Sequence, residues 1–207
     1  MIEKLACKLE RNDEIPNIEL AELLCENNDT FGISEIAEGI RSKEQAISND
    51  CIKVLYEIGA RKPELIAGYA LNFVDMLLSK NNRMVWGSMT ALAEIADICA
   101  DDIMKRIETV YQAYSVGSVI TIDNSMTVFA KLCLADYRNQ TKIFPILITH
   151  FQKCRVKEVP QHFERISICL NAHNSEEIID VIKSRTNELS EAQLKRVNKT
   201  IRLIRYL

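Results

Sequence analysis

One short phrase occurs twice in this chain. SMTALAEI at residues 88–95 and SMTVFAKL at residues 125–132 match in identity or apolar character at every position except Glu94 and Lys131. The two copies begin 37 residues apart, and CIKVLYEI at residues 51–58 lies another 37 residues upstream in the same register. Self-similarity at a period of this length is typical of chains built from stacked structural repeats, so the phrase constrains the architecture before any single residue does.

Three apolar positions recur in each copy at spacing i, i+3, i+6, which places them along one face of a helix. In the three strong copies they are filled by Ile52, Leu55 and Ile58, by Met89, Leu92 and Ile95, and by Met126, Phe129 and Leu132. A weaker copy occurs at residues 20–23, and another at residues 163–170 has Phe163, Ile166 and Cys169 in these places. We therefore expect five helices that turn these residues towards a core.

A second helix fits between successive copies. Residues 64–78, 101–114 and 139–153 all repeat apolar residues every three to four positions. Each repeat is then a helical hairpin, and only four prolines and six glycines interrupt the chain. Pro145 falls inside the last of these patterns and should kink that helix or mark its true start.

A hairpin of two helices cannot bury both of its apolar faces alone. About five of them in a row are expected to stack so that each completes the core of its neighbour. The sequence thus predicts an all-α fold, an α-solenoid of about five antiparallel helical hairpins, forming a single domain over residues 1–207.

Residues 82–103, NRMVWGSMTALAEIADICADDI, resemble the second helix of a HEAT repeat, with an arginine near the start and a small-residue centre. VLYEIGARKPELI at residues 54–66 is similar, including the turn into Pro63. The resemblance to HEAT and armadillo-like helical repeat proteins covers nearly the whole chain. It implies a solenoid fold and a general habit of binding partners, and it brings no catalytic residue.

The sequence contains no Gly-rich phosphate loop, nucleophile elbow or His-Glu-x-x-His motif. We therefore expect a non-enzymatic protein without a cofactor. A few HEAT-like proteins are DNA glycosylases for alkylated bases, which makes nucleic-acid binding or DNA repair the alternative. Such a site needs aromatic residues beside a basic groove, but residues 51–100 and 101–150 each carry 5 basic and 5 acidic residues, which argues against a nucleic-acid partner.

One set of residues has the spacing of metal ligands. His150 and Cys154, and then Cys169 and His173, form two i, i+4 pairs on helices expected to be adjacent, and together they could close a tetrahedral zinc site. Both cysteines also fit the apolar stripe, so ordinary packing is the preferred interpretation and no metal is predicted. All seven cysteines lack a Cys-x-x-Cys pair and are expected to be reduced core residues.

Charge is unevenly distributed along the chain. Residues 1–50 carry 5 basic and 12 acidic side chains, whereas residues 151–207 carry 11 basic and 7 acidic ones. The last helix should be amphipathic. Its inward stripe is expected to contain Leu194, Val197, Ile201 and Ile204, and its outer side Lys195, Lys199 and Arg202, flanked by Arg196 and Arg205. This basic side is either a solvated surface or a patch for an acidic peptide, for phosphate, or for the acidic part of a neighbouring copy.

The expected partner is another protein or peptide, bound on the face opposite the apolar triplets. By the HEAT resemblance, second helices line the concave surface of the solenoid. The predicted contact residues are Asn49, Lys53, Glu57, Trp86, Thr90, Glu94, Asp123, Thr127 and Lys131. Trp86 would lie near the middle of this mixed-charge groove, either as an anchor for the partner or as packing between two repeats.

The start of the sequence, MIEKLACKLERNDE, places charges every few residues and lacks the apolar core of a secretory signal. No later stretch approaches the length of about 20 apolar residues that spans a bilayer. We therefore expect a soluble, cytoplasmic protein.

Overall fold

The computed structural model describes residues 1–205, and every regular element in that range is helical. The α-helices are α1 (Ile15–Asn27), α2 (Thr30–Gly39), α3 (Gln45–Arg61), α4 (Ala70–Met76), α5 (Asn82–Ile95), α6 (Ala100–Lys105), α7 (Ile107–Val116), α8 (Val119–Ala135), α9 (Gln140–Lys153), α10 (Val159–Ile166), α11 (Glu176–Ser184) and α12 (Glu191–Arg205). Short 3-10 turns lie at Ile2–Lys4, Pro63–Leu65, Ala67–Tyr69, Tyr137–Asn139, Val156–Glu158, Ser167–Cys169 and Thr186–Glu188. The predicted all-α fold is confirmed.

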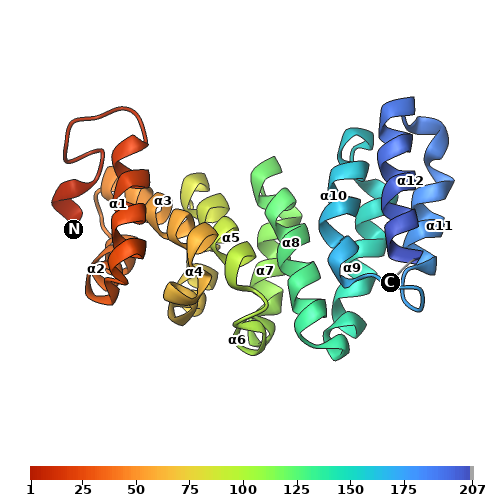
Figure 1. The fold of residues 1–207 in the computed structure, drawn as a ribbon, viewed down its shortest axis with the longest axis horizontal. Helices are drawn as coiled ribbons and strands as arrows, with labels where there is room; N and C mark the ends of the chain where they lie inside the picture. The colour runs from red at the N-terminus through yellow and green to blue at the C-terminus, as the bar shows by residue number, and fades with distance from the viewer. Residues whose placement is uncertain (206–207) are drawn as a thin grey trace. The chain divides into compact units, whose positions relative to one another are not determined.

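The chain divides into two compact units, residues 1–128 and residues 129–207, with the boundary inside α8. In the first unit α3 packs against both α1 and α5, and Figure 1 shows these three helices following one another. In the second unit α9 packs against α11, and α10 packs against α12. The single domain expected over residues 1–207 remains a prediction.

The repeated apolar positions form the core, as the phrase predicts. All nine residues of the three strong copies have an exposed fraction of 0%. The weaker copies fall on α1 and on α10 with its following turn, where Phe163 and Ile166 are also fully buried. The spacing i, i+3, i+6 therefore identified the inward face of these helices correctly.

The helices between the copies are less continuous than expected. Residues 64–78 form two 3-10 turns followed by the short α4, and residues 101–114 are split into α6 and α7 at Arg106. Arg106 leaves the helical region at φ −120° and ψ 21°, and its guanidinium donates to Asp75 of α4 at 3.2 Å. Pro145 does not mark a helix start, because α9 begins at Gln140 and runs through it.

The helix α12 has the expected polarity. Val197, Ile201 and Ile204 are buried, whereas Leu194 is only half-buried. The three predicted outer residues, Lys195, Lys199 and Arg202, are exposed. Ser190 and Gln193 form a capping box at its start, with the Ser190 amide donating to the Gln193 side chain at 2.9 Å and the Gln193 amide to the Ser190 hydroxyl at 3.4 Å. The side chain of Arg205 lies outside the part of the chain that the structure describes.

Candidate binding surface

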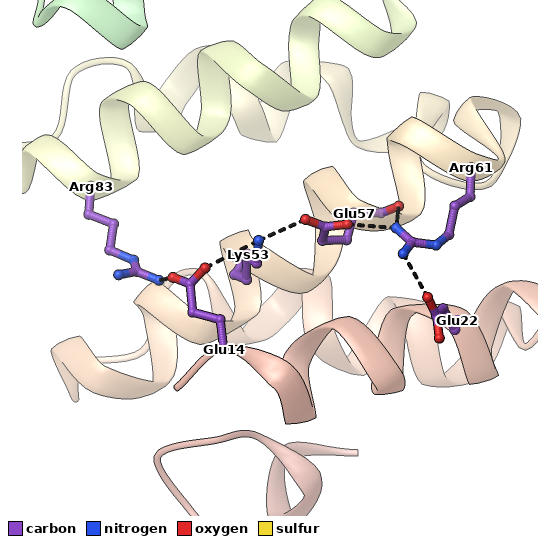
Figure 2. Close-up of polar contacts among 6 residues, drawn as sticks. All are labelled: Glu14, Glu22, Lys53, Glu57, Arg61 and Arg83. Atoms are coloured by element: carbon purple, nitrogen blue, oxygen red, sulfur yellow. Dashed lines mark hydrogen bonds and ion pairs between the residues drawn. The ribbon is translucent and has the colours of Figure 1, made fainter. Parts of the chain in front are cut away.

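A row of six side chains with alternating charge crosses the helices α1, α3 and α5 in the first unit (Figure 2). In order along the row they are Arg83, Glu14, Lys53, Glu57, Arg61 and Glu22. We call these six residues the charge row. On α3 three of them follow one another at i, i+4 and i+8, which places them on one side of the helix.

Lys53 lies at the centre of the charge row and is nearly buried, with its side chain only 9% exposed. Its ammonium lies 3.2 Å from Oε2 of Glu14 and 2.7 Å from Oε1 of Glu57. Figure 2 shows Lys53 held between these two carboxylates. Two neighbouring carboxylates therefore cover the Lys53 ammonium, and whether Lys53 contacts a partner remains a prediction.

The outer members of the row tie α3 to its neighbours. Arg61 donates to Oε2 of Glu57 at 2.6 Å and to Oε1 of Glu22 on α1 at 2.9 Å. At the other end, Arg83 of α5 is hydrogen-bonded to Glu14, which immediately precedes α1. The row thus connects α1, α3 and α5 through contacts that the apolar repeat does not specify.

Burial and pairing act in opposite directions on the two central groups. Burial alone lowers the pKa of the Lys53 ammonium, but its contacts with Glu57, Tyr56 and Glu14 outweigh burial and hold that pKa above the ordinary value. Burial raises the pKa of the Glu57 carboxyl, and the hydrogen bonds from Lys53 and Arg61 more than offset it, so that its pKa lies below 4.5. Both groups are therefore charged at neutral pH.

Acid is expected to weaken the first unit through Glu57. Because the pKa of this carboxyl is lower in the folded state than in the unfolded state, its contribution is present above the unfolded value and is lost as pH falls through the folded value. Urea unfolding followed by Trp86 fluorescence between pH about 6 and about 3 should show a shallower loss of stability in Glu57→Gln than in the wild type. The exposed Glu108→Gln is the control, and an unchanged slope in Glu57→Gln would contradict this role.

Two aromatic rings lie beside the charge row. The rings of Tyr56 and Trp86 have centroids 5.9 Å apart, and the Lys53 ammonium lies 4.8 Å from the centroid of the Tyr56 ring. The Arg83 guanidinium lies 5.8 Å from the centroid of the Trp86 ring, within the range of a cation–π contact. Trp86 is half-buried, so it contributes to packing between α3 and α5 and also keeps part of its ring accessible.

The uncharged polar residues of the predicted surface link α3 to the start of α5, and α5 to α8. Asn49 accepts a hydrogen bond from the Asn81 side chain at 2.8 Å, at the start of α5. Thr90 donates to the Trp86 carbonyl at 2.8 Å and accepts from Asn124 of α8 at the same distance. These bonds fix the positions of side chains that sequence reasoning placed on a common face.

The structure places six of the nine predicted contact residues on α3 and α5. We call Asn49, Lys53, Glu57, Trp86, Thr90 and Glu94 the α3/α5 face, since these residues lie on two helices that pack against each other. Asp123 and Thr127 are half-buried on α8 in the same unit. Lys131 is half-buried in the second unit, so it is not assigned to this face.

Sequence reasoning missed Glu14, Glu22, Tyr56, Arg61 and Arg83. The spacing of Lys53, Glu57 and Arg61 by four residues was a local indication of paired charges on one side of α3. Nothing local indicated that Glu14 and Glu22 would lie opposite residues 39 positions later in the chain.

The four residues with metal-ligand spacing are not gathered by the fold. The two ring nitrogens Nε2 of His150 and Nδ1 of His162 lie 2.8 Å apart in the core, while His173 is exposed. Cys169 donates to the Ile166 carbonyl, as a packed thiol does. Among residues 1–205, no group of three or more histidine, cysteine or acidic side chains is placed to hold one metal ion.

All seven cysteines are free thiols, four of them buried and three half-buried. Burial raises the pKa of the Cys51 thiol to about 12, and burial together with the Asp50 carboxylate raises that of Cys7 to about 11. These thiols stay protonated at neutral pH, which suits packing rather than nucleophilic chemistry. No helix of the described range, residues 1–205, has both the length and the apolar character needed to cross a membrane.

No protein-family model matches the chain, and no curated protein matches its sequence. Solved structures do match its fold. A designed armadillo repeat protein in complex with the peptide (KR)4 is 12% identical with a TM-score of 0.67, and the match covers 90% of this chain and 86% of that one. A second designed armadillo repeat protein is also 12% identical with a TM-score of 0.67, and the match covers 99% of this chain and 100% of that one.

An engineered protein is 16% identical with a TM-score of 0.67, and the match covers 98% of this chain and 96% of that one. At such low identity these matches establish the fold alone. The chain has an armadillo-like helical repeat fold, the α-solenoid that the resemblance to HEAT and armadillo-like proteins implied.

Proposed function

We propose that the chain is a non-enzymatic binding module and that its α3/α5 face binds a peptide segment or helix of another protein. The observation that carries this proposal is the half-buried Trp86 on a face whose polar neighbours are already held in place. Tryptophan is the residue type most enriched among interface anchors. Because Lys53 and Glu57 are ordered by their ion pair before a partner arrives, binding loses little side-chain entropy there.

The charge of this face supports a partner of mixed charge. The charge row contains three basic and three acidic side chains, so it is neutral as a whole. A nucleic-acid backbone requires a surplus of positive charge, which this row does not supply. The solved complex of a designed armadillo repeat protein with a peptide shows that this fold can present a peptide-binding surface, and here the face would extend towards Asp123 and Thr127 on α8.

Replacement of Trp86 by alanine tests the proposal. Peptides are first selected from a random library against the wild-type chain, and their Kd is then measured by titration. Trp86→Ala is expected to weaken the selected peptides about 30-fold, equivalent to about 2 kcal/mol, because it removes a central aromatic contact. The matched control is Tyr137→Ala, which removes an aromatic side chain that is 77% exposed in the second unit and should leave Kd unchanged.

Stability separates the two roles of Trp86. If its only role is to pack α3 against α5, Trp86→Ala lowers the midpoint of thermal unfolding and leaves the Kd of the selected peptides unchanged. That result would contradict the proposed anchor. The location of the site is tested by hydrogen exchange. If the selected peptides protect the amides of α9 to α12 and leave those of α3 and α5 unprotected, the proposed location is wrong.

A further inference from the structure

Two segments of this chain carry nearly pure and opposite charge. From Ile15 to Gly39, through α1 and α2, the sequence contains six acidic residues and no basic one. From Glu191 to Arg205, along α12, it contains five basic residues and one acidic one. The small net charge of −3 conceals this separation.

The acidic side of α1 has a defined composition. Glu19, Leu23 and Glu26 follow one another at i, i+4 and i+7, so they share one side of the helix, and all three are exposed. Phe31 lies just beyond the turn that joins α1 to α2, and its side chain is 84% exposed. We call these four residues the α1 face. It presents two carboxylates on either side of Leu23 and a further exposed apolar side chain, that of Phe31, beyond the end of α1.

The outer side of α12 has the complementary composition at the same spacing. Lys195, Lys199 and Arg202 also follow at i, i+4 and i+7, and Leu203 beside them is 57% exposed. The opposite side of α12 is committed to the core through Val197, Ile201 and Ile204. We call Lys195, Lys199, Arg202 and Leu203 the α12 face.

The charges on both faces are available for an intermolecular contact. Within residues 1–205, no ion pair involves Glu19 or Glu26 on α1, or Lys195, Lys199 or Arg202 on α12. By contrast, Arg196 of α12 is engaged with Glu164 of α10 at 2.9 Å, and Glu22 of α1 with Arg61. Within residues 1–205 the fold therefore pairs the charges next to each face and forms no ion pair with those on the faces, and Lys199 acts on the Glu164 carboxylate only through its electrostatic field, which helps Arg196 to lower the pKa of that carboxyl.

We propose that the α12 face of one copy binds the α1 face of a second copy. Glu19 and Glu26 lie seven residues apart, as Lys195 and Arg202 do, so two acidic and two basic side chains can meet at the same interval of about 10.5 Å along two packed helices. Leu23 and Phe31 add exposed apolar surface to one side of this contact, and Leu203 adds it to the other. The contact joins two different surfaces, so it is heterologous, and it depends on salt because the paired charges are solvent-exposed.

Sedimentation velocity of the wild-type chain tests the association. The weight-average mass is expected to rise with protein concentration at about 50 mM salt and to return to that of a monomer at about 500 mM salt. Two charge-reversed variants, Glu19→Lys/Glu26→Lys and Lys195→Glu/Lys199→Glu/Arg202→Glu, are each expected to remain monomeric at low salt. All five positions are exposed, and circular dichroism checks that both variants keep their helix content.

Mixing the two variants provides the decisive measurement. The reversed α1 face of one variant complements the reversed α12 face of the other, and their unchanged faces complement each other too, so association should return only in the mixture. Asp101→Lys/Glu108→Lys changes the net charge as much as the α1 variant does at two exposed positions elsewhere, and it should associate like the wild type. A monomeric wild type at low salt, or a mixture that stays monomeric, would overturn the proposal, as would a wild type that binds duplex DNA through α12 without self-association.

Discussion

Replacement of Lys53 by methionine is expected to lower the free energy of unfolding by about 3 kcal/mol, because it breaks a nearly buried ion pair while keeping the apolar stem. The Lys53 side chain is 9% exposed and lies between the carboxylates of Glu14 and Glu57. Without the ammonium, these two carboxylates lose the cation between them and repel each other, while Glu14 keeps its contact with Arg83 and Glu57 its contact with Arg61. Urea unfolding followed by the fluorescence of Trp86 measures the effect directly, since this single tryptophan lies beside the charge row.

The matched control is Lys105→Met. Lys105 also pairs with a carboxylate at 2.8 Å, that of Asp102, but its side chain is 71% exposed, and a pair in solvent contributes little. Its unfolding midpoint should stay close to that of the wild type. If Lys53→Met and Lys105→Met shift the midpoint equally, the charge row does not stabilise the first unit as its burial implies.

The charge row also shows which contacts could be predicted from the sequence and which could not. The residues of α3 could be placed on one face, because helical spacing fixes the direction in which each side chain points. Their partners could not be identified, since the contacts of Lys53 with Glu14 and of Arg61 with Glu22 depend on the register in which α1 packs on α3. That register is set by the shapes of many apolar side chains together, and no local spacing encodes it.

The fold was more predictable than the surface for a related reason. A core position is defined by the single property of being apolar, and Ile52, Met89 and Met126 satisfy it at a strict interval of 37 residues. The continuity of the intervening helices was predicted less well. Their breaks, such as the one at Arg106, follow from backbone angles and from a tertiary bond to Asp75, which an apolar period does not contain.

Replacement of Gly87 by valine is expected to lower the free energy of unfolding by about 3 kcal/mol, through overpacking of the contact between α5 and α3. A methyl group at Gly87 would lie 2.8 Å from Cγ1 and 3.2 Å from Cγ2 of Ile52. Ile52 is fully buried, so it has no free space to move into. Valine adds two further carbons, so the two helices must separate, and the α3/α5 face would be disturbed with them.

Gly68→Val is the matched control, because a methyl group at this exposed glycine would meet no atom within 4 Å apart from those of its two chain neighbours. A double-mutant cycle with Ile52→Ala identifies the cause of the Gly87→Val effect. Ile52→Ala alone should cost about 2 to 5 kcal/mol by opening a cavity, but it also removes both of the carbons that crowd Gly87. The double variant should therefore be more stable than the sum of the two single effects predicts, by about 1 kcal/mol or more. Additive effects would mean that valine at Gly87 destabilises α5 by itself, without a clash against α3.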